Sequence, residues 1–274
     1  EASEVLRSTV IDLVICMPGN ADNDAFDVAR DIKSRFPNIH CVVLTPFSHG
    51  ITKRMENEDL SIFDYVFCWL GNTNLILSII KLIEDKMNLE HDIQEAGVQM
   101  ILLVEDSIRF YSSILPNLYN YILEQSKNFS KEALNRHAAT MRMRGRPKVV
   151  LARTYEEAQK LYDKYSNNTL GVISDARFPL KSAAKAFGNK VETEAKPKHR
   201  TDTFGREKCP DAGLQLFRYI RKNDPFVPLI LESSESDNRA KAEAEGFRFV
   251  DKNSKKMSVD LRRLMEEHMG FGDF

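Results

Sequence analysis

The chain has 274 residues, of which 42% are hydrophobic and 29% are charged, and its formal net charge is −1. At about 150 residues per domain, this length fits roughly two domains with cores of their own, and the composition excludes a disordered chain or a fibre. No apolar run approaches the roughly 18 residues of a membrane span, and the N-terminus lacks the basic and apolar regions of a signal peptide.

Short apolar runs alternate with longer stretches of helical period, which is typical of an α/β fold with a mainly parallel sheet. The predicted strands cover residues 11–16, 40–44, 65–68, 100–104, 148–152, 170–174, 227–231 and 247–250. The predicted helices cover residues 24–36, 74–87, 110–125, 155–165, 212–222, 237–245 and 258–269. Pro37 ends the first of these helices.

The two halves of the chain repeat one unit. In each half an apolar strand leads through a Pro loop to an Asp-led helix, and the next strand ends in a hydroxyl residue, Thr45 or Ser233. A further strand and an amphipathic helix follow. The first copy lacks its first strand, first helix and second strand. We therefore expect two doubly wound parallel domains: an N-terminally incomplete one over residues 1–95 and a complete five-stranded one over residues 98–270.

Two long polar stretches, residues 126–147 and 181–210, interrupt the second copy. Loops of this length are usually functional or disordered. The second stretch follows Pro179 directly, and we consider three roles for it: it covers the neighbouring acidic residues with positive charge, it alters the access of a substrate, or it is a mobile loop.

The net charge hides an asymmetry between the halves. Residues 1–97 carry 8 Lys and Arg against 16 Asp and Glu, a net of −8, and the remainder carries 31 against 24, a net of +7. Opposite charges favour docking of the halves on each other or of the basic half on an acidic partner. The basic run at residues 141–148 lacks interleaved aromatic residues and no helix-turn-helix follows, so we interpret it as a solvated charge run rather than a nucleic-acid site.

The four cysteines form no C-x-x-C pair and have no histidine at zinc-ligand spacing. Cys16, Cys41 and Cys68 fall inside apolar strand-like runs, which predicts buried thiols rather than ligands. We expect a reducing, cytoplasmic compartment.

Polar residues follow the predicted strands of the second copy. The first strand ends in Glu105 and Asp106, the third in Asp175 and the fourth in Ser233, and Lys252 follows the fifth. Taken singly, an Asp after a strand is more often a helix cap or a solvated loop residue. Because the carboxyl ends of parallel strands share one edge of a sheet, we expect all five side chains to meet there.

Three crowded carboxylates repel one another and require a cation, and hard oxygen ligands favour Mg²⁺, which commonly bridges to phosphate. The lysine and the serine would supply donors for phosphoryl oxygens. The set therefore predicts attack by one carboxylate on phosphorus.

These motifs resemble the receiver domain of two-component response regulators, over residues 98–270 apart from the two insertions. ILLVEDS is similar to the family's strand with an acidic pair, SDARFP to its phosphoacceptor motif, PLILESS to its strand with Thr or Ser, and FVDKN to its strand with Lys. The resemblance implies that Asp175 accepts a phosphoryl group and that Asp106 binds Mg²⁺ directly. It also implies that Glu105 acts on the water shell of the metal and that the backbone carbonyl of Arg177 completes the coordination.

By the same resemblance, Ser233 would bond to the phosphate and Lys252 would pair with it. Phe249 stands where the family carries its switch aromatic, without the hydroxyl of a tyrosine, and Asn253 stands where a proline is usual. The first copy keeps Thr45 and Tyr65 but has no acceptor carboxylate or lysine at the matching strand ends. We interpret it as a degenerate receiver that serves dimerisation or docking.

The function that the resemblance implies is a cytoplasmic phosphoacceptor of a two-component or phosphorelay pathway, which supports its own phosphotransfer and dephosphorylation rather than acting as an ordinary enzyme. The donor would be a histidine kinase or a phosphotransfer protein. Since the chain ends abruptly on apolar residues, we expect an attached or separate output domain outside it. A homodimer is considered as well. Neither nucleic acid nor a membrane is expected as a partner. The alternative is a non-phosphorylated pseudo-receiver scaffold. An aspartyl-phosphate hydrolase is disfavoured because Arg177 stands where its general acid is needed.

Overall fold

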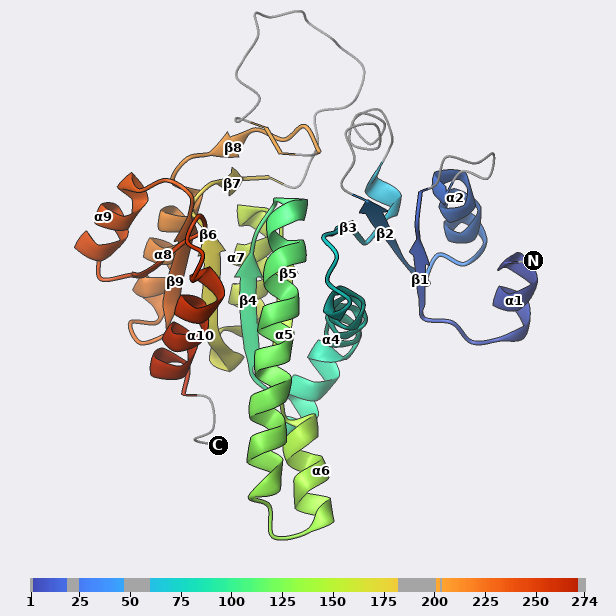
Figure 1. Cartoon of the computed structure of the whole chain (residues 1–274), viewed down its shortest axis with the longest axis horizontal. Coiled ribbons are helices and arrows are strands. Elements are labelled where there is room, and N and C mark those ends of the chain that lie inside the picture. Colours follow the sequence, from blue (N-terminus) through green and yellow to red (C-terminus); the bar gives the residue numbers. More distant parts are fainter. Residues whose placement is uncertain (1, 19–24, 47–59, 182–200, 203, 271–274) are drawn as a thin grey trace, which may run out of the picture. The chain divides into compact units, whose positions relative to one another are not determined.

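The computed structural model of the chain divides into two compact units (Figure 1). It describes residues 2–18, 25–46, 60–181, 201–202 and 204–270. The first unit comprises Glu1–Ile83 and Ile108–Pro116, and the second comprises Glu84–Ser107 and Asn117–Phe274. Helices α4 (Asn74–Ala96) and α5 (Ile108–Lys131) contribute residues to both units, so the two are described separately.

The first unit is built on a three-stranded parallel sheet in the order β1-β2-β3. Its elements are α1 (Ala2–Ser8), β1 (Leu13–Cys16), α2 (Ala25–Arg35), β2 (His40–Pro46), the 3-10 helix η1 (Leu60–Ile62) and β3 (Tyr65–Trp69). Phe26 of α2 is fully buried and packs edge to face on Phe63, with ring centroids 5.7 Å apart. The predicted start of this helix at Asp24 lies outside the described residues.

The second unit contains a five-stranded sheet in the order β10-β9-β6-β4-β5, in which every pairing is parallel. Its strands are β4 (Met100–Val104), β5 (Lys148–Ala152), β6 (Thr169–Asp175), β9 (Leu229–Ser233) and β10 (Arg248–Asp251). Counted along the chain, this is the order 2-1-3-4-5 of flavodoxin-like doubly wound folds. The predicted α/β class with a five-stranded parallel sheet is confirmed.

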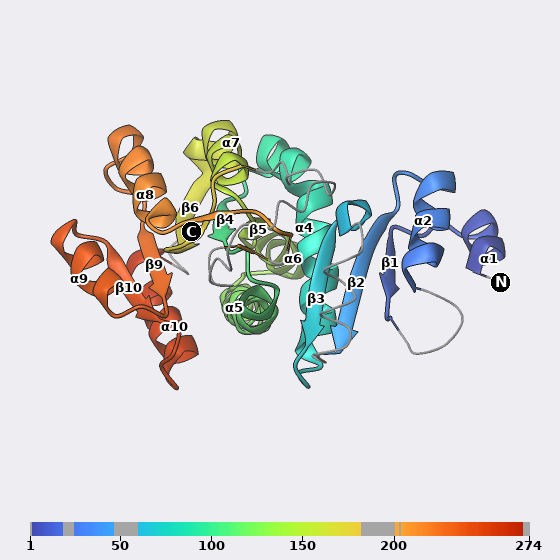
Figure 2. The ribbon, with the colours of Figure 1, turned by 90° about the horizontal axis from the view of Figure 1, so that it is seen from above.

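Helices cover both faces of this sheet, with α5 and α10 on one face and α7 and α8 on the other (Figure 2). The helices are α7 (Tyr155–Tyr165), α8 (Ala212–Asn223), α9 (Asp237–Ala244) and α10 (Met257–His268). Because both faces are covered, β4 and β5 are buried along their whole length, which explains their continuous apolar runs. Within the described residues, none of the helices combines the length and the apolar character that a membrane span requires.

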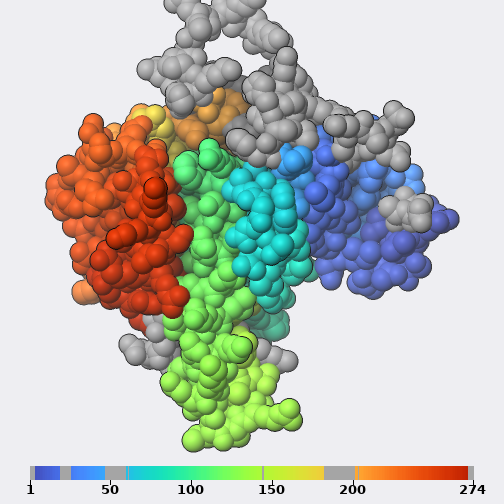
Figure 3. Space-filling view, viewed as in Figure 1, coloured from blue at the N-terminus to red at the C-terminus, as the bar shows by residue number. Residues whose placement is uncertain are grey.

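The stretch 126–147 is largely helical. It extends α5 to Lys131 and then forms α6 (Arg136–Arg144), where the Asn135 side chain caps the helix by accepting a hydrogen bond of 2.8 Å from the Ala138 N–H. This helical hairpin forms the green projection at the bottom of Figure 3.

The C-terminal end of the stretch 181–210 pairs with residues that precede the stretch. β7 (Phe178–Pro179) pairs with β8 (Lys208–Cys209), so that Phe178 lies opposite Cys209 and Pro179 opposite Lys208. The segment between them, residues 182–200, lies outside the described residues. After β8 the chain continues into α8, which begins beside the carboxyl edge of the five-stranded sheet.

Candidate functional site

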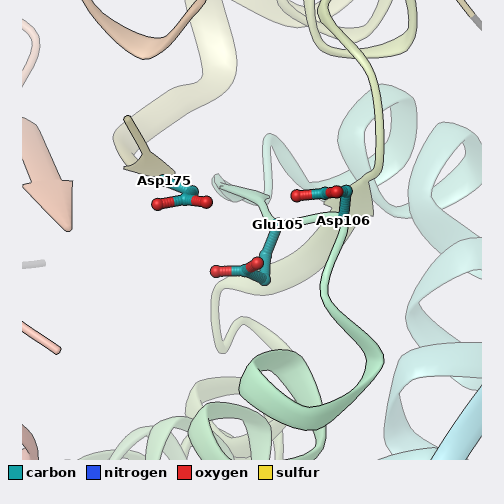
Figure 4. Close-up of side chains that lie close together, drawn as sticks. All are labelled: Glu105, Asp106 and Asp175. Carbon is teal, nitrogen blue, oxygen red and sulfur yellow. The ribbon is translucent and has the colours of Figure 1, made fainter. Parts of the chain in front are cut away.

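The carboxyl edge of the second unit gathers three carboxylates (Figure 4). Glu105 and Asp106 follow β4 directly, and Asp175 is the last residue of β6, the strand that pairs with β4. One carboxylate oxygen from each residue lies within 4.8 Å of the other two. Glu105 and Asp106 are fully buried, whereas the side chain of Asp175 remains 14% exposed. The site therefore opens to solvent at Asp175.

Lys252 compensates two of these charges. Its ammonium lies 2.9 Å from Asp175 Oδ1 and donates a short hydrogen bond to Glu105 Oε2, while its own side chain is 2% exposed. Burial opposes the charged form of Lys252, but the negative charges of Asp175, Glu105 and Glu232 outweigh burial and raise its pKa above the ordinary value. The ammonium is therefore a fixed positive charge beside the most exposed carboxylate.

Asp106 contacts a different lysine. Lys208 Nζ of β8 lies 2.6 Å from Asp106 Oδ2. Despite this ion pair, neither carboxylate oxygen accepts a hydrogen bond of good geometry from the described residues. Burial is the largest influence on the Asp106 carboxyl and raises its pKa to about 6, while the charge of Lys208 lowers it. Asp106 is therefore a buried carboxylate whose charge is compensated by an ion pair without a well-formed hydrogen bond, which is an unfavourable arrangement for a buried charge.

The backbone around Asp175 is held tightly. The Ala176 N–H donates to Asp175 Oδ1 over 2.8 Å and to the carbonyl of Glu232 over 3.0 Å. Gly213, in the first turn of α8, lies so close that a Cβ atom there would stand 2.3 Å from the carbonyl oxygen of Asp175. The glycine thus allows α8 to press on the strand end that carries the carboxylate.

Ser233 lies at the same edge but its hydroxyl is occupied locally. Its Oγ accepts hydrogen bonds from the Glu235 N–H at 3.0 Å and from Asn238 Nδ2 at 2.9 Å, so the contacts described for it belong to its own turn. Its predicted bond to a phosphoryl group stays a prediction.

Arg177 and Phe249, the other two predicted site residues, contact neighbouring side chains. The guanidinium of Arg177 pairs with Glu235 at 2.8 Å, and the predicted ligation by its backbone carbonyl stays a prediction. Phe249 is half-buried, packs against the core and carries the guanidinium of Arg239 4.7 Å above its ring centroid. A switch based on Phe249 would therefore involve α9 as well.

Sequence reasoning missed two charged residues of the site. Lys208 belongs to the long polar stretch, and no local pattern links it to Asp106. Glu232 lies beside Asp175 in the sheet, is fully buried and has no hydrogen bond to either oxygen among the described residues. A charged residue inside the apolar run PLILESS indicates a buried carboxylate, so the sequence did carry a signal for Glu232. Burial raises the pKa of Glu232 to about 7.

The donor set fits a divalent cation. Glu105, Asp106 and Asp175 offer only oxygen ligands at one edge of the sheet, and among the described residues the Asp106 oxygens accept no hydrogen bond of good geometry. Hard oxygen ligands in this number suit Mg²⁺ completed by water.

No protein-family model matches the chain, and no curated protein is similar to it. Among solved structures, it is similar to a response regulator receiver domain protein from Clostridium thermocellum, with 18% identity and a TM-score of 0.37 over 63% of this chain and 95% of that one. It is also similar to a two-component transcriptional regulator AraC from Clostridium phytofermentans ISDg, with 16% identity and a TM-score of 0.32 over 63% of this chain and 93% of that one. The function therefore has to be inferred from the residues of this chain.

Proposed function

We propose that the second unit is a receiver module of two-component signalling that accepts a phosphoryl group on Asp175 with the help of Mg²⁺. The observation that carries the proposal is the meeting of Glu105, Asp106, Asp175 and Lys252 at the carboxyl edge of a five-stranded parallel sheet. Ligand sites of open α/β sheets lie at this edge. The site combines an accessible carboxylate, oxygen ligands for a cation and a buried ammonium.

The two oxygens of Asp175 have different surroundings. Oδ1 is in contact with both the ammonium of Lys252 and the Ala176 N–H, whereas neither of these contacts involves Oδ2. We assign the nucleophile to Oδ2. It attacks the phosphorus of an acyl phosphate or phosphohistidine donor, a new P–O bond forms as the bond to the leaving group breaks, and the leaving group takes the electron pair.

The other residues stabilise the charge that spreads over the phosphoryl oxygens. Lys252 keeps its positive charge beside Asp175, and Asp106 and Glu105 would hold the cation. When bound, Mg²⁺ would neutralise the negative charge of the phosphoryl oxygens and bring them next to the carboxylates. The donor would be a histidine kinase or a phosphotransfer protein, and an output domain would respond.

For residues 1–95, which include the three strands of the first unit, we propose a degenerate receiver that serves docking or dimerisation. Its three parallel strands correspond to the last three strands of the second unit in order. Cys16 ends β1 where an acceptor carboxylate is needed, and β3 ends in Cys68 and Trp69. The cysteines of the described chain are all free, which supports a reducing, cytoplasmic location.

A pseudo-receiver scaffold is the second candidate. The ion pair between Lys208 and Asp106 favours it, because two ammonium groups already compensate the three carboxylates. In that case the chain would dock on its partners without phosphorylation.

Incubation with acetyl phosphate and Mg²⁺, followed by mass spectrometry, tests the proposal. We expect one added phosphoryl group on the wild type and on Asp237→Asn, a variant at an exposed aspartate of α9, and none on Asp175→Asn or without Mg²⁺. Equal labelling of Asp175→Asn and wild type would refute the assignment. Absence of labelling from all three proteins would favour the scaffold.

A further inference from the structure

The strand β8 brings a second ammonium into the acidic site. In the β7–β8 pair, Lys208 lies opposite Pro179, and Pro179 follows Asp175 by four residues. The Nζ atom of Lys208 lies 2.6 Å from Asp106 Oδ2. Asp106 is fully buried, and the side chain of Lys208 is only 16% exposed. The contact is therefore part of the interior of the site rather than a surface ion pair.

Hydrogen bonds to the side chain of Asp202 precede β8 in the chain. Thr201 and Glu207 form an antiparallel bridge, and Asp202 Oδ1 accepts hydrogen bonds from the backbone N–H groups of Phe204 and Arg206. The guanidinium of Arg206 pairs with Asp202 Oδ2 at 2.6 Å, and the Asp202 side chain is fully buried. These contacts fix the direction in which the chain enters β8 and so place Lys208 at the site.

The two lysines divide the carboxylates between them. Lys252 contacts Glu105 and Asp175, whereas Lys208 contacts Asp106. An ammonium at 2.6 Å occupies the space that a cation bound to the same oxygen would need. An ammonium and a divalent cation that share one buried carboxylate also repel each other strongly.

We propose that Lys208 is a built-in competitor for the divalent cation: its ammonium has to leave Asp106 before the cation binds, so cation binding and the docking of β8 oppose each other. The inference rests on the proposed function, since it concerns the cation used for phosphorylation of Asp175. A partner that draws β8 away from β7 would raise the affinity for Mg²⁺. β8, which carries Lys208, then acts as a regulatory element of the site.

Calorimetric titration with Mg²⁺ alone tests the competition. We expect Lys208→Gln to bind Mg²⁺ at least about tenfold more tightly than the wild type, which corresponds to about 1.4 kcal/mol. The control Lys160→Gln removes the same charge from an exposed side chain of α7, and we expect it to bind as the wild type does. Lys208→Arg, which keeps the charge, should retain weak binding. Circular dichroism verifies that each variant is folded.

A second measurement uses the wild type and does not depend on the folding of a variant. Acylation of lysine amines, followed by mass spectrometry, should become at least threefold faster at Lys208 when Mg²⁺ is added and remain constant at Lys160. The inference would be overturned by an acylation rate at Lys208 that does not change when Mg²⁺ is added. It would also be overturned if Lys208→Gln bound Mg²⁺ no more tightly than the wild type, or did not bind it at all. Labelling of Asp175 together with equal affinities would retain the proposed function alone. Tighter binding by Lys208→Gln without labelling of Asp175 would retain the competition alone.

Discussion

Replacing Lys252 by methionine removes the ammonium that two carboxylates share at the sheet edge. In the structure this ammonium contacts Glu105 and Asp175, and its side chain is 2% exposed. Methionine has a similar length, so the chief change is the loss of charge and hydrogen bonds. Removal of one partner from a buried ion pair typically costs about 3–5 kcal/mol, because the remaining charge stays buried without compensation. This is a large part of the free energy of unfolding of an ordinary domain.

The loss should depend on pH. Burial, the largest influence, already raises the pKa of Glu105, and removal of the Lys252 charge raises it further. Below that raised pKa the folded variant holds a proton that the unfolded chain releases near the ordinary value. Because the folded state binds more protons between these two values, stability falls as pH rises, by about 1.4 kcal/mol per pH unit for one proton. The wild type holds the same proton up to a Glu105 pKa of about 8, so the stabilities of the two proteins differ in slope only above that pH. We expect a loss of about 1–2 kcal/mol at pH 6, where Glu105 is protonated in both folded proteins and lost hydrogen bonds dominate, and of about 3–5 kcal/mol at pH 9.5.

Urea unfolding at the two pH values, followed by far-UV circular dichroism, measures both losses. The fluorescence of Trp69, the single tryptophan, reports the first unit separately. The matched control is Lys241→Met, because Lys241 pairs with Asp211 at 3.0 Å while its side chain is 51% exposed. Exposed pairs contribute about 0–1 kcal/mol. If Lys252→Met were no more destabilising than this control, or if its loss were the same at both pH values, the charge compensation inferred for the site would be wrong.

Three further substitutions test buried contacts of the second unit. Gly213→Ala should destabilise the second unit by about 1–3 kcal/mol and reduce phosphoryl labelling, because its Cβ would stand 2.3 Å from the carbonyl oxygen of Asp175; urea unfolding and labelling with unchanged results would contradict the tight packing of α8. Glu232→Gln should be more stable than the wild type at pH 8, by up to about 3 kcal/mol, and no more stable at pH 4. Burial raises the Glu232 pKa from 4.5 to about 7, so the folded wild type retains a proton that the unfolded chain loses as pH rises through this window; equal thermal stability of the two proteins at pH 8 would refute this. Asp85→Asn should cost about 3–5 kcal/mol in urea unfolding, because the fully buried carboxylate pairs with Arg146 at 2.6 Å, and a loss below about 1 kcal/mol would show that the pair contributes little.

Part of the fold is legible in the sequence because burial imposes a pattern. The apolar runs MILLV in β4 and VVLA in β5 predict both strands with their observed bounds, since a strand covered on both faces has no polar alternation. The fourth strand of this sheet is predicted at 227–231 and observed two residues later, as β9. The prediction stops before Glu232, because a buried carboxylate interrupts the apolar pattern.

Other elements have no such pattern. α5 continues to Lys131 through polar residues, where the apolar period fades, and β7 and β8 have two residues each. Their pairing joins residues on either side of a long stretch, so no local signal indicates it.

The same distinction applies to the site. The carboxyl ends of parallel strands predict that Glu105, Asp106, Asp175 and Lys252 lie together, and the structure brings them together. The contact of Lys208 with Asp106 depends on the β7–β8 pairing and was beyond prediction from sequence patterns.

A crystal structure of the chain with Mg²⁺ and beryllofluoride tests the central claim most directly. We predict one Mg²⁺ with oxygens of Asp106 and Asp175 at about 2.1 Å, beryllium bonded to a carboxylate oxygen of Asp175, and Lys252 within hydrogen-bond distance of a fluoride. Carboxylates that remain paired with the two lysines at saturating Mg²⁺, with no beryllofluoride on Asp175, would contradict the phosphoacceptor role.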